Sequence, residues 1–440
     1  MDELGLSQAP VVLGVSLGTI MVPVYVSSPL QLVLSDSTLA ELLAIREALK
    51  IFCQSEWVNI SNLIIEFDSS VAVSWEVNSI VDWMAKVVPG AMFVAAIIVG
   101  VVITIFVLLL RKCLKKRKKE ERKRKYFIQN GGAYLRRLIS TGALVGDSKV
   151  FSPEELEIAT DGFNENRILG RGGQATVFKA MLRSGRVVAV KRAKTVEEWI
   201  RESFINEIIV LLEIKHDNVV GLIGFCLEAE KPLLVYEYIP NGSLYQILHE
   251  QPDNFLNSWE VRRRIIREVA EAITYLHAIR TTDFNGICHR DLKSQNILLD
   301  QQYRSVLADF GIARFLGPDR SHLTTQAIGS LGYIDPELQF SGEYTKRSDV
   351  YSYGVVIAEL LTGEKAISRR WGNLAMQLKS AVKNDNISAI LDCKIVTEEN
   401  KNELSSYTKL SRRCLKKKGK NRPFMEDILN ELNRLQGLFG

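Results

Sequence analysis

Two short stretches of the chain carry residue types that together can do chemistry on a phosphate group. In the first, Asp291 is followed two positions later by Lys293 and five positions later by Asn296. The second begins at Asp309, in the sequence Asp-Phe-Gly. A carboxylate can accept the proton of a hydroxyl group, a lysine can neutralise an anion, and carboxylate and amide oxygens are suitable ligands for Mg²⁺. Phosphoryl transfer needs charge neutralisation and positioning above all, so this set predicts a phosphate-transfer site.

A glycine-rich stretch at 169–177 could supply the phosphate-binding part of such a site. Small residues let backbone N–H groups approach phosphate oxygens closely. The stretch alone is a weak signal, because a glycine-rich turn without a ligand looks the same. The strand-like run 188–191 ends in Lys191, and Glu207 follows sixteen residues later in a stretch with the apolar spacing of a helix.

In their order and spacing, these stretches resemble the motifs of protein kinases, from about residue 151 to residue 435. The sequence CHRDLKSQN resembles the catalytic loop of that family, and DFG resembles its magnesium-binding motif. The resemblance implies that Asp291 orients the attacking hydroxyl and accepts its proton, while Lys293 contacts the γ-phosphate. It also assigns Mg²⁺ binding to Asn296 and Asp309. A lysine two residues after the catalytic aspartate is typical of serine/threonine kinases.

The same resemblance implies an ATP site built from the glycine-rich stretch, the pair of Lys191 and Glu207, and a hinge at 235–238 whose backbone would contact the adenine. The residues expected to contact ATP are Leu169, Gly170, Gly172, Gly173, Val177, Ala189, Lys191, Glu237, Tyr238 and Leu298. Ala175 departs from the family pattern, because it stands in place of a third glycine. Its methyl group is expected near the phosphates, where it could slow turnover.

Other residues match structural positions of the family. Glu337, in the element that closes the activation segment, is expected to form an ion pair with Arg422. Asp349 is expected to hold the backbone of the catalytic loop. At the N-terminal edge of the matched region, Ser152 and Glu155 have the spacing of a capping box, which predicts the start of a helix.

Two neighbouring threonines in the activation segment, Thr324 and Thr325, are the expected phosphorylation sites. Ser330 is a weaker candidate. A phosphate adds negative charge that an arginine can bind. Arg290, directly before Asp291, is therefore expected to receive it.

Longer matches narrow the resemblance to plant receptor-like kinases of the wall-associated type. They are FSPEELEIATDGFNENRILG at 151–170, LLVYEYIPNGSLYQIL at 233–248, HRDLKSQNILLD at 289–300 and GYIDPEL at 332–338. Proteins of that type are plasma-membrane receptors with an intracellular serine/threonine kinase. The resemblance implies the α+β, two-lobed kinase fold over 151–440, with a sheet-rich lobe to about residue 239 and a helical lobe at 240–435. ATP and Mg²⁺ would bind between the lobes, the substrates would be proteins, and a co-receptor or a second copy could be a further partner.

A membrane-spanning helix is predicted at 87–110, where no charged residue occurs. The stretch is long enough to cross a hydrocarbon layer about 30 Å thick. A buried core helix is the less favoured alternative, because such helices rarely run so long without a polar face. The dense Lys and Arg block at 111–125 follows directly, as expected on the cytoplasmic side. We therefore expect a single-pass protein of the plasma membrane, with a juxtamembrane linker at 111–150 and a cytoplasmic kinase domain.

The basic block could bind either nucleic acid or a membrane surface. Its position directly after the predicted span favours the headgroups of anionic lipids, so no nucleic-acid partner is expected. The six cysteines form no CxxC pair and no zinc-binding spacing, and only Cys53 precedes the block. A disulfide-rich extracellular module is therefore excluded before the span.

The N-terminal segment 1–86 carries a second, shorter resemblance. Residues from about 37 to 75 resemble a truncated plant retroelement RNase H-like domain of α/β type, in STLAELLAIREALKIF and LIIEFDSSVAVSW. Glu41 and Asp68 would match two of its metal-binding carboxylates. Hydrolysis with two metal ions needs carboxylates that hold both ions, and the opening strand with its aspartate is missing. We therefore expect an inactive remnant without nuclease activity.

Two interpretations of the kinase-like region remain open at this point. It is either an active kinase or a catalytically impaired pseudokinase that acts as a scaffold at the membrane. Pseudokinases usually lack one of three catalytic residues, but Lys191, Asp291 and Asp309 are all present here. Only Ala175 favours the scaffold, so an active kinase is the preferred interpretation.

Overall fold

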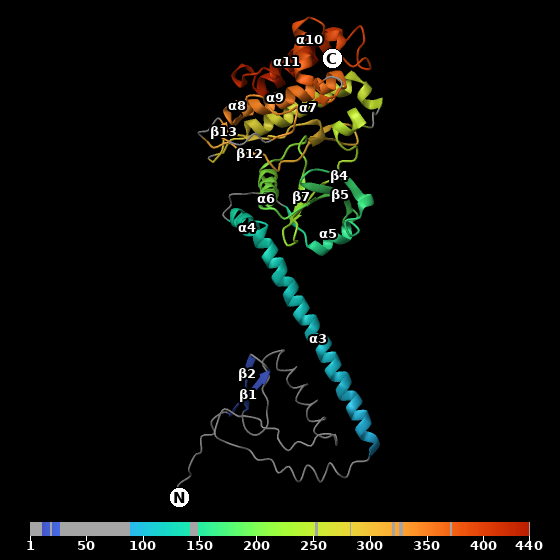
Figure 1. Cartoon of the computed structure of the whole chain (residues 1–440), viewed down its shortest axis with the longest axis vertical. Helices are drawn as coiled ribbons and strands as arrows, with labels where there is room; N and C mark the ends of the chain where they lie inside the picture. Colours follow the sequence, from blue (N-terminus) through green and yellow to red (C-terminus); the bar gives the residue numbers. More distant parts are fainter. Residues whose placement is uncertain are drawn as a thin grey trace. The chain divides into compact units, whose positions relative to one another are not determined.

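The computed structural model describes residues 11–17, 20–26, 89–140, 148–250, 254–281, 283–318, 322–324, 329–369 and 372–439. Side chains are described from residue 100 onward, except those of Asn254, Thr324 and Phe439. The chain divides into two units, Met1–Lys119 and Glu120–Gly440 (Figure 1). The stretch 37–75 that resembles RNase H, with Glu41 and Asp68, lies outside the described residues.

The first unit contains a β-hairpin and part of a long helix. Strand β1 (Val11–Leu17) pairs antiparallel with β2 (Ile20–Val26). Helix α3 (Pro89–Gln129) begins within the predicted membrane span and continues through the basic block into the second unit. Over the residues whose side chains are described, no helix is both long enough and apolar enough to cross a membrane. The side chains of 87–99, in the first half of the predicted span, lie outside those residues.

The smaller lobe of the second unit is built on a six-stranded sheet with the order β3-β7-β8-β6-β5-β4. Its strands are β3 (Lys149–Val150), β4 (Ile168–Arg171), β5 (Ala175–Met181), β6 (Val187–Ala193), β7 (Leu222–Cys226) and β8 (Leu233–Glu237). All neighbours pair antiparallel except β3 and β7, which are parallel. Along much of β5 and β6, buried side chains alternate with more exposed ones, because successive side chains of a strand point to opposite faces.

Two helices belong to this lobe: α5 (Pro153–Ala159) and α6 (Glu198–Glu213), with the short 3₁₀ turn η1 (Glu165–Arg167) between them. The predicted capping box of α5 is confirmed. The backbone N–H of Glu155 donates to the Ser152 hydroxyl at 3.2 Å, and the Glu155 carboxylate accepts from the Ser152 N–H at 3.3 Å. Helix α6 buries the apolar side chains whose spacing predicted it, including Phe204 and Ile208.

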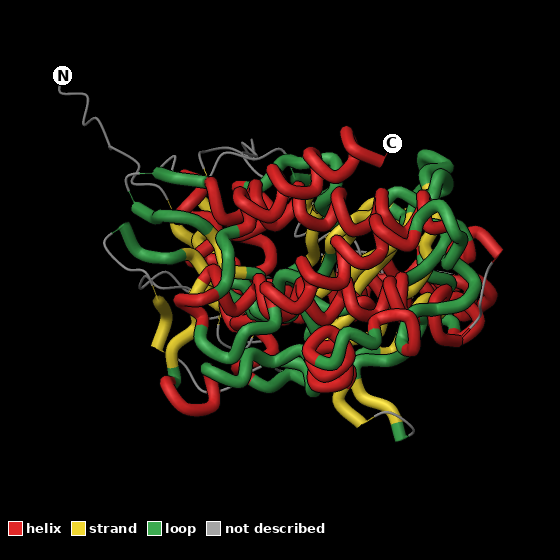
Figure 2. Tube along the Cα trace, turned by 90° about the horizontal axis from the view of Figure 1, so that it is seen from above, coloured by secondary structure: helices red, strands yellow, loops and turns green. Residues whose placement is uncertain are grey.

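The larger lobe is mainly helical (Figure 2). Its α-helices are α7 (Trp259–Ala278), α8 (Leu338–Ser341), α9 (Lys346–Thr362), α10 (Leu374–Lys383), α11 (Lys401–Cys414) and α12 (Met425–Phe439). Short helical turns are η2 (Gln246–Glu250), η3 (Asn254–Asn257), η4 (Ser294–Asn296), η5 (Ile387–Ala389) and η6 (Gly419–Asn421). Every residue of α9 from Ser348 to Thr362 is buried, as expected for a helix enclosed on all sides.

Four pairs of short antiparallel strands complete the larger lobe. They are β9 (Ile287–Cys288) with β12 (Arg314–Phe315), β10 (Ile297–Leu299) with β11 (Ser305–Leu307), β13 (His322–Thr324) with β14 (Glu343–Thr345), and β15 (Ile367–Ser368) with β16 (Gly372–Asn373). The catalytic loop lies between β9 and β10. Along the chain, β8 is the last strand of the six-stranded sheet, and it ends at Glu237, close to the predicted lobe boundary. The predicted α+β fold with a sheet-rich and a helical lobe is confirmed.

The predicted juxtamembrane linker at 111–150 is not a free linker throughout. Helix α3 continues to Gln129, and α4 (Gly132–Ser140) follows after a turn. Leu135 of α4 is 1% exposed and belongs to the main apolar core of the second unit. The charged residues next to Leu135 made this segment look solvent-exposed in the sequence. Leu135 is a core residue because α4 packs against the rest of the second unit.

The ion pair predicted between Glu337 and Arg422 is wrong. The guanidinium group of Arg422 instead binds both carboxylate oxygens of Asp335, at 2.5 and 2.6 Å. Glu337 accepts a hydrogen bond of 2.6 Å from the backbone N–H of Gly419. Both members of the Asp335–Arg422 pair are buried, and a planar guanidinium group matches a carboxylate best through two parallel bonds.

Asp335→Ala is expected to lower the free energy of unfolding by about 3–5 kcal/mol, because it leaves a buried arginine without its counter-charge. Glu337→Gln is expected to cost less than about 1.5 kcal/mol, because an amide oxygen can still accept from Gly419. Denaturant titration of the full chain measures both values. A loss for Glu337→Gln as large as that for Asp335→Ala would contradict the observed pairing.

Candidate active site

A largely buried lysine lies at the centre of the candidate site. Lys191 is on β6, and its ammonium nitrogen lies 2.7 Å from Glu207 Oε2 on α6 and 2.6 Å from Asp309 Oδ1. The expected pair of Lys191 and Glu207 is therefore present, and Asp309 joins it. The side chain of Glu207 is 1% exposed, whereas that of Asp309 is 42% exposed. One carboxylate is thus enclosed by protein and the other is open to solvent.

The carboxylates keep Lys191 charged. Burial by itself would lower the pKa of Lys191, but the attraction of Asp309 and Glu207 outweighs burial and raises this pKa above its ordinary value. Burial would also raise the pKa of Asp309, yet Lys191 and Lys293 lower it to about 2. Lys191 is therefore a cation and Asp309 an anion at neutral pH.

Helix α6 is tied to its surroundings by two side chains that sequence motifs do not single out. Tyr236 on β8 donates a hydrogen bond of 2.7 Å to Glu207 Oε1. Asn206 donates from its amide nitrogen to the backbone carbonyls of Phe310, Gly311 and Ala313. The only signal for Asn206 is a polar residue within an apolar helical stretch. These bonds fix α6 between the sheet and the start of the activation segment.

Asp349 of α9 holds the catalytic loop by its backbone. Its carboxylate accepts from the N–H groups of His289 and Arg290, each at 3.0 Å. Tyr344 and His277 also donate to this fully buried carboxylate, at 2.7 and 2.8 Å. The contacts agree with the role expected of Asp349.

Two site residues have a left-handed backbone conformation. The φ angle is +71° at Arg290 and +67° at Asp309, a region that residues other than glycine seldom adopt. Such strain persists only where surrounding contacts enforce it, and it is concentrated at functional sites. Here Asp349 fixes the backbone at Arg290, and Asn206 fixes the backbone directly after Asp309.

The carboxylate of Asp291 lies in a small polar network. Lys293 Nζ is 2.6 Å from its Oδ2, and the Ser330 hydroxyl donates to its Oδ1 at 2.8 Å. Lys293 also donates to Ser330 at 2.8 Å. Asn296 donates from Nδ2 to the backbone carbonyl of Asp291 at 2.8 Å. Ser330 therefore belongs to the site, although its sequence suggested only a weaker phosphorylation candidate.

The glycine-rich loop connects β4 to β5 and leaves open space over its backbone. A side chain at Gly170 or Gly173 would meet no protein atom within 4 Å, and one at Gly172 would meet only the Ala175 carbonyl at 3.5 Å. None of these glycines has a positive φ angle. Neither packing nor backbone conformation explains them, and the open space leaves room for a phosphate to approach the backbone. The Ala175 methyl group is buried in the main apolar core, so it does not occupy this open space.

Asp309 and Asn296 fit a magnesium ion that arrives with a nucleotide. The amide nitrogen of Asn296 is used by Asp291, while its Oδ1 accepts no hydrogen bond from the described residues. Among those residues, no group of three or more His, Cys, Asp or Glu side chains could hold a metal ion. Mg²⁺ commonly takes one or two protein ligands and completes its shell with phosphate oxygens and water.

The apolar residues expected around the adenine come from both lobes. Val177 on β5 pairs with Lys191, and Ala189 on β6 pairs with Tyr236. Leu298 lies on β10, in the larger lobe. The three apolar side chains are only partly buried, so a flat base could cover the apolar area that remains.

The remaining predicted positions lie at the edges of the site. Leu169 is partly exposed on β4, and Glu237 at the end of β8 accepts from the Gly221 N–H at 2.7 Å. The backbone N–H of Tyr238 has no hydrogen-bond partner among the described residues. Arg290 donates to the carbonyl of Ile312 at 3.2 Å. The expected phosphorylation sites, the side chain of Thr324 and all of Thr325, lie outside the described residues.

A family model described as "Protein kinase domain" matches residues 163–432. The chain belongs to the protein kinase family. Wall-associated receptor kinase-like 1 and Wall-associated receptor kinase-like 3, both of Arabidopsis thaliana, are 48% and 46% identical to it over 316 residues. Each match covers 71% of this chain and 43% of the relative. The chain thus spans less than half the length of these relatives, and its kinase domain is similar to theirs, as its motifs predicted.

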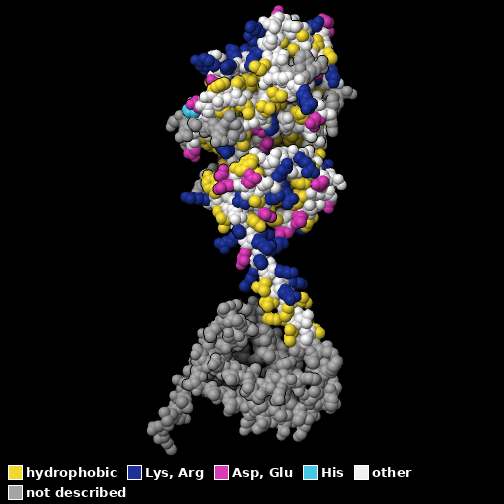
Figure 3. Space-filling view, viewed as in Figure 1, with side chains coloured by type: hydrophobic (Ala, Val, Ile, Leu, Met, Phe, Trp, Pro, Cys, Tyr) yellow, Lys and Arg dark blue, Asp and Glu magenta, His cyan; other side chains and the backbone are white. Residues whose placement is uncertain are grey.

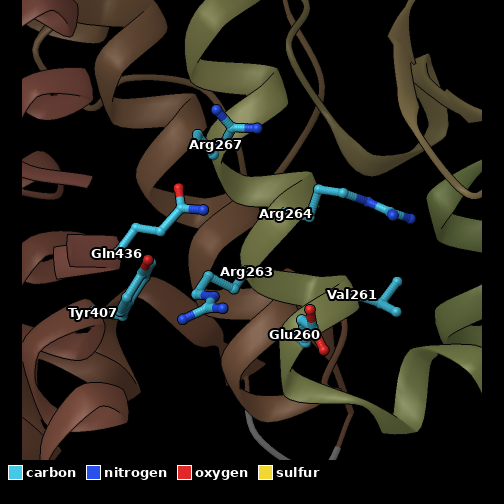
Figure 4. A pocket seen from close by; sticks show the side chains of 7 residues that line it. All are labelled: Glu260, Val261, Arg263, Arg264, Arg267, Tyr407 and Gln436. Carbon is cyan, nitrogen blue, oxygen red and sulfur yellow. The ribbon is translucent and has the colours of Figure 1, made fainter. Parts of the chain in front are cut away.

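A separate pocket of this kinase lies along α7, away from the predicted site residues. It has a volume of about 320 Å³ and is lined by Glu260, Val261, Arg263, Arg264, Arg267, Tyr407 and Gln436 (Figure 4). Its arginines do not form an anion site, because carboxylates already neutralise them. Arg263 lies 3.1 Å from Glu403, and Arg267 lies 3.0 Å from Glu271.

Ser330→Ala is expected to lower kcat about tenfold, because Asp291 loses a hydrogen bond and Lys293 loses an acceptor. Ser330→Thr keeps the hydroxyl and should retain most of the activity. Steady-state phosphorylation of a protein substrate by the full chain measures both. Equal activity of Ser330→Ala and the unchanged chain would exclude Ser330 from the site.

Proposed function

We propose that the chain is an active protein kinase that transfers the γ-phosphate of ATP to serine and threonine hydroxyls of proteins. The proposal is carried by Asp291, whose carboxylate lies 2.6 Å from the ammonium group of Lys293. A hydroxyl proton could pass to Asp291 while Lys293 neutralises the charge of the transferred phosphate. Membership of the kinase family and the similarity to receptor kinases support this reaction.

The other predicted residues would bind and orient the nucleotide. Lys191, kept in place by Glu207, would contact the α- and β-phosphates. Asp309 and Asn296 would hold Mg²⁺, which when bound supplies positive charge next to the phosphate oxygens. Arg290 would bind a phosphate on the activation segment. The remaining ATP contacts are proposed for Leu169, Gly170, Gly172, Gly173, Val177, Ala189, Glu237, Tyr238 and Leu298.

We also propose that this kinase acts as a receptor-like protein anchored in the plasma membrane by a single helix at 87–110. The described apolar side chains of α3 in this range are exposed, Ile103 and Leu109 by 57% and 59%. Lys and Arg side chains follow them along the helix (Figure 3). An exposed apolar stretch followed by basic residues suits a bilayer with anionic headgroups on the kinase side.

The alternative is a pseudokinase that serves as a scaffold, and Ala175 is the feature that favours it. The buried position of its methyl group weakens this alternative. The site also retains Lys191, Asp291 and Asp309, which impaired kinases usually lose in part. Activity is therefore the better supported proposal.

Asp291→Asn is expected to lower phosphate transfer about 10³-fold, because the site loses its proton acceptor. Lys191→Met is expected to lower it at least about 100-fold, because a charged phosphate contact is lost. Transfer from labelled ATP by the full chain, followed by phosphoamino-acid analysis, measures both. Phosphate should appear on serine and threonine.

Lys194→Met is the matched control, because Lys194 is an exposed lysine three residues beyond Lys191. It should leave transfer unchanged. Intact binding of MgATP by the unchanged chain without any transfer would replace the kinase proposal by the scaffold proposal.

Ala175→Gly should change kcat/KM for ATP less than about threefold, because the methyl group it removes is packed inside the protein. It should also lower the free energy of unfolding by about 1 kcal/mol, since glycine loses more backbone freedom in a strand and leaves apolar space unfilled. Kinetics and denaturant titration of the full chain measure the two effects. A gain in kcat/KM of tenfold or more would mean that Ala175 impairs the enzyme.

A further inference from the structure

Three consecutive residues of α6 contact three different parts of the protein. Successive side chains of a helix point about 100° apart, so neighbours in sequence face different surroundings. Glu207 reaches Lys191 on the sheet, and Asn206 donates to the backbone that follows Asp309. Ile205 is buried against the turn between α3 and α4. The position of α6 therefore depends on the sheet, the activation segment and the juxtamembrane turn together.

The juxtamembrane turn fits α6 closely. Gly131 has a φ angle of +78°, and a side chain there would lie 2.7 Å from Cγ1 of Ile205. Glycine meets both requirements, the backbone conformation and the close approach. Asn130 is buried, and its Nδ2 donates to the carbonyls of Leu227 and Ala229 at 2.9 and 2.8 Å. The turn is thus fastened to the segment after β7 and packs on α6.

Leu135 of α4 is buried as well, at 1% exposed. It belongs to the same apolar cluster as Phe204 and Ile208 of α6. Tyr134, its neighbour, is 57% exposed, so α4 has a buried side and a solvent side. A short helix with one apolar side gains its stability from the surface on which that side packs.

The N-terminal end of α6 provides little local anchoring. Glu197 occupies the N-cap position, but its carboxylate accepts from the Trp199 indole and not from a backbone N–H of the helix. Tertiary contacts must therefore set where α6 lies. A small displacement would separate Glu207 from Lys191, and a buried carboxylate without its partner is unfavourable.

We propose that residues 120–140 position α6 and so hold Glu207 against Lys191, which makes catalysis depend on docking of the juxtamembrane segment. The inference rests on the proposed kinase function. Asn130 and Leu135 are positioning residues, because both act through α6. The docked turn and the 2.7 Å ion pair occur in the same structure, as the proposal requires.

The test is Leu135→Ala in the full-length chain in detergent, with Tyr134→Ala as the matched control on the exposed side of α4. Turnover and the affinity for MgATP are measured, and thermal unfolding gives the folded fraction. Leu135→Ala should lower kcat/KM for ATP about tenfold and weaken MgATP binding, while Tyr134→Ala changes neither. Asn130→Ala removes two hydrogen bonds without touching the apolar packing, and it should act in the same direction if Leu135→Ala does not fold.

A merely structural role makes a different prediction, in which activity falls with the folded fraction and KM stays constant. In a Glu207→Gln background, Leu135→Ala should have no further effect, because the pair that it supports is already lost. Equal effects in both backgrounds, an unchanged kcat/KM or a rise in activity would overturn the proposal. If the unchanged chain transfers no phosphate, the proposed function fails. The affinity of Leu135→Ala and Tyr134→Ala for MgATP then tests the docking proposal without any activity measurement.

Discussion

The ammonium group of Lys191 lies between the carboxylates of Glu207 and Asp309, and the rest of the site depends on that contact. A buried charge without a partner is unfavourable, and each of these groups comes from a different element. Lys191 is on β6, Glu207 on α6, and Asp309 at the start of the activation segment. The charges balance only when all three elements are in place. Correct packing of the smaller lobe and assembly of the site are therefore one physical requirement.

The parts of the site that could be predicted from sequence are those set by short spacing. Asp291, Lys293 and Asn296 lie on one loop, so their side chains meet wherever that loop is held. The capping box of α5 involves only residues 152–155, and local geometry decides it. The pair of Lys191 and Glu207 is different, because one residue lies on a strand and the other on the next helix, sixteen residues along the chain. Their contact could be predicted only because the order of the motifs along the chain matches that of a known fold.

The parts that could not be predicted depend on contacts between distant segments. Asp335 and Glu337 are both acidic and lie two residues apart, so the sequence does not decide which one meets Arg422. In the structure, Glu337 accepts a hydrogen bond from the backbone N–H of Gly419, and Asp335 pairs with Arg422. Leu135 is similar, because its charged neighbours give no sign of burial until the packing of α4 is known. Ala175 stands where the family pattern has a glycine. The effect of this difference on activity cannot be predicted until the direction of the Ala175 methyl group is known.

The two carboxylates around Lys191 suit different tasks because their exposure differs. Glu207 is 1% exposed, so separation from Lys191 would leave its carboxylate as a buried charge without a counter-charge. It is therefore a permanent partner of Lys191. Asp309 is 42% exposed and can exchange Lys191 for another cation at little cost in desolvation. Under the proposed function, Lys191 would then hold a phosphate and Asp309 a metal ion. Anything that moves α6 disturbs the contact between Glu207 and Lys191 first, and with it the position of Lys191.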